Sequence, residues 1–115
     1  NKAPSSMALG SEMLQHIVAN DPSIDAIFFC NDDLAQGALL AAQRLKIKVP
    51  QQLAIAGFND LTGSDLIGPG LTTIRTPRAD IGQAASQMLL ALMRQEDVPS
   101  HSVDVGYELM VRGST

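Results

Sequence analysis

Two Asn-Asp pairs follow two apolar segments of this 115-residue chain. Asn31-Asp32-Asp33 comes directly after residues 26–30, and Asn59-Asp60 comes just after residues 53–57. Amide and carboxylate groups together offer hydrogen-bond donors and acceptors. In an open parallel sheet, ligands bind outside the carboxyl ends of the strands. If both apolar segments are strands, the sequence predicts a binding site for a small, hydroxyl-rich molecule along one edge of a sheet.

Both pairs also have a purely structural interpretation. Asn and Asp are favoured helix caps, and acidic residues in the first turn complement the helix dipole, so we expect Asp32 or Asp33 to play that part. Asn31 is then the residue placed to face a cleft. Asn59-Asp60 could equally form an Asx turn. Spacing alone therefore leaves the structural and the ligand-binding interpretations open.

The elements that would position these residues alternate along the chain. Apolar residues at helical spacing predict helices from Ser5 or Ser6 to about residue 19, from just after residue 32 to about 45, and over about 78–95. Continuous apolar runs predict strands covered on both faces at 26–30 and 53–57, with a third short strand at 71–74. Alternation over 103–111 predicts a half-exposed strand. This order predicts an α/β fold with a largely parallel sheet.

Composition excludes several classes of function. The net charge is −4 and the eight basic residues are scattered, which disfavours direct binding of nucleic acid by these residues. No apolar stretch is long enough to span a bilayer. The single Cys30 closes an apolar run, so we expect a buried small hydrophobe in a reducing compartment.

Enzyme and metal chemistry find no support in the spacing. His16 and His101 fall in a predicted helix and a loop, and neither belongs to a catalytic or metal-binding pattern. Gly-Pro-Gly at 68–70 lacks the Lys-Ser/Thr of a phosphate loop. A phosphoacceptor receiver would need a Lys after a later strand, and the last Lys is Lys48. We therefore predict no catalytic residue, no metal and no cofactor.

An ordered set of motifs resembles the lactose-repressor family of bacterial transcription regulators. The segment from 26 to 38, reading AIFFCNDDLAQGA, resembles the family's strand, Asn-Asp pair and small-residue helix. Val49-Pro50, Gly57-Phe58-Asn59-Asp60, Leu71–Arg75 and the terminal Val111–Thr115 follow in the family's order. Residues 76–82 and 103–107 look most like gluconate-utilisation repressors.

The resemblance implies a type I periplasmic-binding-protein-like effector domain of two lobes with a three-layer parallel sheet. Residues 1–75 would form most of the C-terminal lobe, 76–102 a crossover and a helix of the other lobe, and 103–115 the returning strand and tail. By the same resemblance Asn31 and Asn59 would contact the ligand, with Asp60 a weaker candidate. Asn59 stands where the family commonly has Asp, and the loss of that charge favours a sugar acid such as gluconate.

The stretch from 34 to 43 carries no charge, which indicates a second apolar surface beyond the one that packs on the sheet. The family dimerises through the matching helix and the loop that follows. The residues expected at a two-fold interface are Gln36, Leu39, Leu40, Gln43, Asp65 and Ile67.

The sequence thus predicts the effector-binding and dimerisation region of a cytoplasmic repressor that senses a sugar or sugar acid. Operator DNA would be bound by an N-terminal domain absent from this chain. The alternative is a periplasmic sugar-binding receptor of a transporter, which shares the fold but is secreted and usually monomeric.

Overall fold

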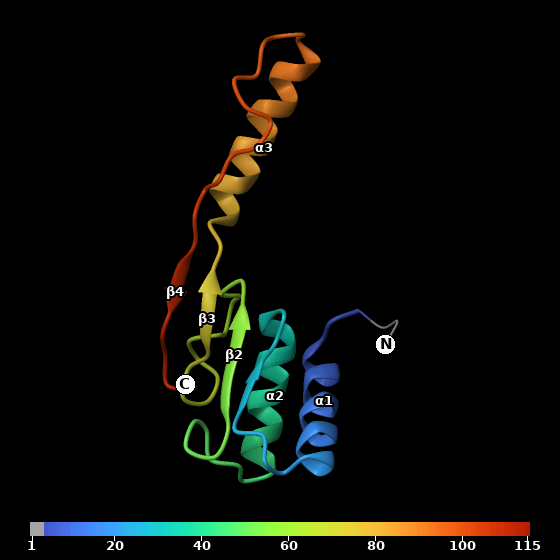
Figure 1. Ribbon diagram of the computed structural model, residues 1–115, viewed down its shortest axis with the longest axis vertical. Coiled ribbons are helices and arrows are strands. Elements are labelled where there is room, and N and C mark those ends of the chain that lie inside the picture. Colours follow the sequence, from blue (N-terminus) through green and yellow to red (C-terminus); the bar gives the residue numbers. More distant parts are fainter. Residues whose placement is uncertain (1–3) are drawn as a thin grey trace. The chain divides into compact units, whose positions relative to one another are not determined.

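The computed structural model describes residues 4–115 (Figure 1). In chain order its elements are α1 (Met7–Asn20), β1 (Ala26–Phe28), α2 (Asp32–Arg44), β2 (Ala54–Phe58), β3 (Thr72–Arg75), α3 (Arg78–Met93) and β4 (Glu108–Met110). The chain divides into two compact units. One comprises the residues up to Arg75 together with Leu109–Thr115, and the other comprises Thr76–Glu108.

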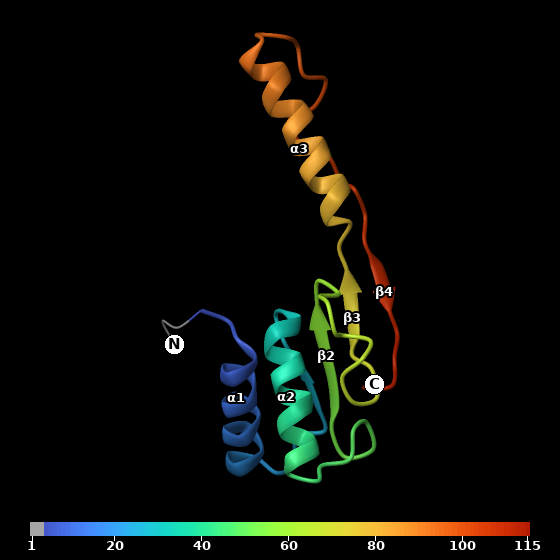
Figure 2. The ribbon, with the colours of Figure 1, turned by 180° about the vertical axis from the view of Figure 1, so that it is seen from behind.

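The first unit is built on a sheet with the strand order β1-β2-β3-β4. β1, β2 and β3 are parallel, with Ala26 opposite Ala54 and Gly57 opposite Thr73. α2 packs on β2, and α1 packs on α2, so that α2 lies between α1 and the strands (Figures 1 and 2). The α/β fold with a largely parallel sheet is the one that the sequence predicts.

The hydrophobic core of this unit lies between α2 and the sheet. Leu34 and Leu39 of α2 pack there with Ile55 of β2 and with Leu71, which precedes β3. Leu14 of α1 joins the same cluster. The core explains why so few positions of α2 are polar: nine of its residues are buried.

Two glycines bring α1 and α2 unusually close together. A Cβ atom on Gly10 would overlap the backbone of Leu34, and a Cβ on Gly37 would overlap the backbone of Met7. Any larger residue at either position would push the helices apart.

Local capping explains where the helices begin and end. Ser6 caps α1 by accepting a hydrogen bond from the Leu9 amide at 3.1 Å. α2 ends in a Schellman motif, in which Lys46 adopts a φ of 58° and the Ile47 amide donates to the Ala42 carbonyl.

The C-terminal tail that follows β4 is hydrogen-bonded to β2 and β3. The Ser114 carbonyl accepts from the Ile55 amide, while the Ser114 hydroxyl accepts from the Thr72 amide and donates to the Ile55 carbonyl. The fully buried Ser114 thereby bridges Ile55 of β2 and Thr72 of β3.

Several sequence expectations need correction. β1 ends at Phe28, whose side chain is 61% exposed, because β1 is an edge strand and the helices of this unit cover only one face. Cys30 lies beyond the strand and is exposed, not buried. The last strand covers only Glu108–Met110. Residues 103–107 belong to none of the strands of the part of the chain that the structure describes.

In the second unit, α3 has no buried residue. Ile81, Ala85 and Met88 of α3 line a small hollow with Val103 and Val105 of the returning segment. α3 therefore carries the apolar face that its spacing predicts, and that face is partly exposed: Ile81 and Leu92 are 44% and 49% exposed.

Candidate functional site

Asn31 begins α2 at the carboxyl end of β1. Its Oδ1 accepts a hydrogen bond from the Leu34 amide at 3.1 Å, which makes Asn31 the N-cap. The cap had been expected at Asp32 or Asp33; those two residues instead form the first turn. Capping uses only the oxygen, Oδ1, of the Asn31 side-chain amide. Within residues 4–115 its half-buried amide group makes no hydrogen bond, so its donors are available to a ligand.

Asp32 is the centre of a buried hydrogen-bond network. Its Oδ2 accepts from the Leu61 amide at 2.8 Å and from the Ser64 hydroxyl at 2.6 Å. Its Oδ1 accepts from the Thr73 hydroxyl at 2.6 Å. The carboxylate is fully buried and lies at the positive end of α2. It therefore ties the start of α2 to the loop after β2 and to β3.

Two neighbours make this network possible. Gly57 lies against the carboxylate, and a Cβ atom there would overlap Asp32 Oδ1. Gln36, one turn further along α2, donates to Ser64 Oγ at 3.0 Å and to the Thr62 carbonyl at 3.1 Å. Every buried polar side-chain atom of the described residues has a partner.

Asn59 and Asp60 lie at the carboxyl end of β2 in a turn that requires left-handed backbone. Their φ angles are 106° and 50°, a region that Asn and Asp enter more readily than most residues. The backbone amide of Asn59 donates to the Ile74 carbonyl at 2.8 Å, and the backbone amide of Asp60 donates to Thr73 Oγ1 at 3.3 Å. The turn is thereby fixed beside the end of β3.

The Asp60 carboxylate lies between two arginines. Its Oδ2 is 2.7 Å from Arg75 Nε, and its Oδ1 is 2.8 Å from Arg112 Nη2. Burial raises the pKa of Asp60, but the hydrogen bonds and charges of Arg112 and Arg75 outweigh this effect and hold the pKa below its ordinary value. Asp60 is thus a charged partner of the arginines.

The strand ends therefore bring together what the sequence predicted and two residues that it missed. Asn31, Asn59 and Asp60 follow β1 and β2 on the carboxyl side of the parallel strands. Arg75, the last residue of β3, and Arg112 of the tail were not expected there. In the sequence Arg75 directly follows the short strand predicted at 71–74, and that position was a signal that could have indicated it.

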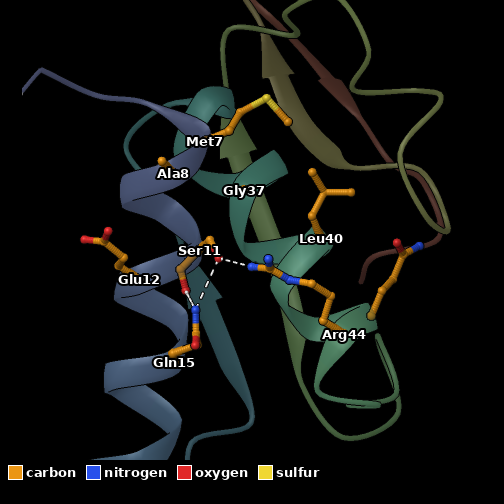
Figure 3. Close-up of a pocket in the computed structure, with 9 residues that line it drawn as sticks. Met7, Ala8, Ser11, Glu12, Gln15, Gly37, Leu40 and Arg44 are labelled. Carbon is orange, nitrogen blue, oxygen red and sulfur yellow. Dashed lines mark hydrogen bonds between the residues drawn. The ribbon is translucent and has the colours of Figure 1, made fainter.

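A second feature of the first unit is a groove of about 610 Å³ between α1 and α2 (Figure 3). Met7, Gly37 and Leu40 line it, and Arg44 donates to the hydroxyl of Ser11 across it. Gly37, where the two helices approach closely, is among the residues that line the groove.

The residues expected at a dimer interface occupy different environments. Leu39 is 1% exposed in the core, and Gln36 is buried with its amide bound to Thr62 and Ser64, so neither side chain reaches the surface. Leu40 and Gln43 are exposed and line the groove. Two further positions lie in the loop after β2: Asp65, which is exposed, and Ile67, which packs partly against the core.

Within residues 4–115, no group of three or more His, Cys, Asp or Glu side chains could hold a metal ion. In the same part of the chain, no helix is long and apolar enough to cross a membrane.

The family model of the periplasmic binding protein-like domain matches residues 1–115. The chain belongs to this family. Its relatives place it with the lactose-repressor type of regulator that the motifs resemble. The HTH-type transcriptional regulator GntR of Pseudomonas aeruginosa is 54% identical over 112 residues, which is 97% of this chain and 33% of that protein. IdnR of Escherichia coli is 39% identical over 94% of this chain and 32% of that protein.

Solved structures of the family agree. The transcription regulator GntR of Chromobacterium violaceum superposes with a TM-score of 0.91 at 51% identity, over 96% of this chain and 41% of that one. A putative LacI-family regulator of Sanguibacter keddieii gives 0.84 at 31% identity, over 96% and 43%.

This family member spans about a third of the length of the curated relatives that it matches. Those relatives are regulators, so the alternative of a transporter's receptor is set aside.

Proposed function

We propose that this chain supplies most of one lobe of the effector-binding region of a transcriptional repressor, and that the effector is a sugar acid such as gluconate. The observation that carries the proposal is the edge at the carboxyl ends of β1 and β2. There the amide donors of Asn31 are unused within the described residues, and Asn59 lies in a turn fixed against β3. These groups suit the hydroxyls of a polyol.

The charges at this edge favour an anionic effector. Asn59 carries no charge, and Asp60 is neutralised by Arg75 and Arg112. A free carboxylate a few ångströms from an anionic ligand would repel it by about 1 kcal/mol or more in a wet site. With that repulsion absent, a sugar acid is accommodated as well as a neutral sugar, or better.

We infer that the residues at this edge serve binding and not catalysis. The described residues offer no metal-binding group, and Asp32 is enclosed by donors that leave it unavailable to a substrate. We infer that the effector acts by closing this lobe on a second lobe, to which residues 76–102 would belong. Different affinity for the open and closed states would then change the binding of operator DNA by an N-terminal domain outside this chain. Such a protein would work in the cytoplasm, where the DNA is.

The groove between α1 and α2 suits the dimer interface. Leu40, Gln43 and Met7 are exposed and uncharged, and they line the groove together with the charged Glu12 and Arg44. Asp65 and Ile67 would extend it through the loop after β2. A two-fold interface uses the same patch on both subunits, and a groove beside a projecting leucine can meet its own copy in this way.

Calorimetry of the full-length protein tests the effector. We expect gluconate to bind more tightly than glucitol, which has the same six-carbon polyol chain without the carboxylate. Asn59→Asp should weaken gluconate about tenfold and leave glucitol nearly unchanged, because the new carboxylate repels only the anion. Tighter binding of glucitol than of gluconate by the unchanged protein would contradict the sugar-acid proposal.

A gel-shift titration with operator DNA tests regulation separately. Gluconate should change the DNA affinity of the unchanged protein and should do so less well for Asn31→Asp. That variant keeps the helix cap but loses the amide donors.

A further inference from the structure

Glu12 and Arg44 carry opposite charges on the two walls of the groove between α1 and α2. Glu12 belongs to α1 and Arg44 to α2, and both are exposed. Arg44 donates to the hydroxyl of Ser11, the residue next to Glu12, so the two charges lie at the same level along the groove. Figure 3 shows the Glu12 side chain extending away from Arg44. Within residues 4–115 neither side chain forms an ion pair, so both charges are open to a partner outside the subunit.

The two walls of the groove allow two arrangements with a second copy of the chain. In the first, the two-fold axis runs along the groove, and α1 of each subunit lies over α2 of the other. In the second, the axis crosses the groove, and each helix lies over its own copy. Every contact across a two-fold interface occurs twice, so the charges act in duplicate in both arrangements.

The charges favour the first arrangement. There Glu12 of each subunit faces Arg44 of the other, which gives two pairs of opposite charge. The second arrangement sets Glu12 against Glu12 and Arg44 against Arg44, and like charges opposite each other disfavour association. A carboxylate is also a stronger partner for a guanidinium than a neutral hydroxyl is. We therefore expect Arg44 to exchange Ser11 for Glu12 of the second copy.

The apolar residues of the groove fit the same arrangement. Leu40 of α2 and Met7 of α1 are 38% and 37% exposed, and both line the groove. With α1 over α2 of the second copy, each Leu40 would pack against Met7 and Ala8 of the other subunit. The exposed apolar side chains would then lie between the two ion pairs, as in interfaces with an apolar centre and a polar rim.

We propose that a second copy of this chain docks on the groove with α1 over α2, and that reciprocal ion pairs between Glu12 and Arg44 fix this orientation. This inference rests on the proposed dimer and deepens it, because it names the charges that select the partner and its direction. The pairs act on specificity more than on affinity. Exposed ion pairs stabilise little by themselves, whereas like charges exclude the wrong orientation.

Reversal of each charge, alone and in a mixture, is the test. Sedimentation measures the dimer dissociation constant of the full-length protein. Glu12→Arg replaces both ion pairs by repulsion between arginines, and Arg44→Glu replaces them by repulsion between carboxylates, so each variant alone should dimerise about 25-fold more weakly. Equimolar mixing should restore dimers to within about threefold of the unchanged protein. In the mixed dimer the introduced arginine faces the introduced glutamate, and one original pair is kept.

Two milder variants keep the test decisive if a reversed subunit folds poorly. Glu12→Gln and Arg44→Gln each remove both ion pairs, so each should weaken the dimer about fivefold, and the double variant should weaken it no further. Lys48→Glu is the matched control for Arg44→Glu. Lys48 is exposed between α2 and β2 and does not line the groove, so the same change of charge there should leave the dissociation constant unchanged.

The outcomes separate this inference from the dimer on which it rests. If the unchanged protein is a monomer at micromolar concentration, the proposed dimer fails and the inference fails with it. If Leu40→Asp dissociates the dimer but the charge reversals do not, or if folded variants fail to dimerise on mixing, the groove is the interface and the proposed orientation is wrong. Reversed variants that dimerise normally alone, yet prefer each other when mixed, would indicate that each helix lies over its own copy. The inference is also overturned if Lys48→Glu weakens the dimer as much as Arg44→Glu does.

Discussion

Replacement of Asp32 by Asn tests whether the buried network holds the strand-end edge together. The carboxylate accepts three hydrogen bonds, from the Leu61 amide, the Ser64 hydroxyl and the Thr73 hydroxyl. An Asn side chain offers one acceptor oxygen in place of two. The hydroxyls can rotate to accept from the new NH₂ group, but the Leu61 amide can only donate.

The expected cost follows from these contacts. Hydrogen bonds to a charged group contribute about 1.5–3 kcal/mol each. Asp32→Asn removes the charge and so weakens all three hydrogen bonds, but it abolishes no more than two of them. We expect a loss of about 2–3 kcal/mol in the free energy of unfolding. Asp32→Ala leaves every donor unsatisfied and should cost about 4 kcal/mol.

Asp33→Asn is the matched control, because it removes the same charge from the same turn. Asp33 is half-buried, and among residues 4–115 its side chain makes no hydrogen bond. Only its interaction with the helix dipole is lost, about 0.3–1 kcal/mol.

Urea denaturation gives the free energies, and hydrogen exchange at the Leu61 amide gives the local effect. Protection of Leu61 should fall in Asp32→Asn and be unchanged in Asp33→Asn. Equal stability losses in the two variants, with Leu61 still protected, would refute the assignment of Asp32 as the residue that fixes the loop.

Three further predictions concern the fold and the interface. Gly37→Ala should destabilise the protein by about 2–3 kcal/mol in thermal unfolding, because the new methyl group overlaps the Met7 backbone; a change below about 0.5 kcal/mol would show that α1 moves aside freely. The pKa of Asp60 is held below its ordinary value of 3.8. Its ion pairs therefore stabilise the fold fully above pH 3.8, and this stabilisation is lost as the pH falls through the lowered pKa. Stability measured from pH 6 down to about pH 3 should therefore decline less steeply for Asp60→Asn than for the unchanged protein, and parallel curves would contradict the pairing. Leu40→Asp should convert a dimer to a monomer in sedimentation at micromolar concentration, whereas Leu45→Asp, an exposed leucine that does not line the groove, should not; a dimer that survives Leu40→Asp would place the interface elsewhere.

The fold was predictable because its signals are local. The apolar periodicity of α1 and α2, the Ser6 cap and the short apolar strands each depend on neighbouring residues. The ends of the strands were less predictable. The extent of β1 depends on which faces of the sheet are covered, and a continuous apolar run such as residues 26–30 does not encode that.

The candidate site was predicted only in part, since its charges are paired over long range. Asp60 and Arg112 are 52 residues apart in the chain, and no pattern in the sequence joins them. Gln36 was expected at a two-fold interface because it lies in the uncharged stretch from 34 to 43. The structure explains it instead as a buried donor to Ser64, a contact that depends on how the loop after β2 folds over α2.

The central claim is that Asn31 and Asn59 bind a polyhydroxylated acid at the carboxyl ends of the strands. Full-length protein with ¹⁵N-labelled asparagine, titrated with gluconate, tests it most directly. The side-chain amide signals of both residues should shift along one saturation curve, while that of Asn20, at the far end of α1, stays fixed. Saturable binding of gluconate that leaves the signals of Asn31 and Asn59 in place would contradict the account.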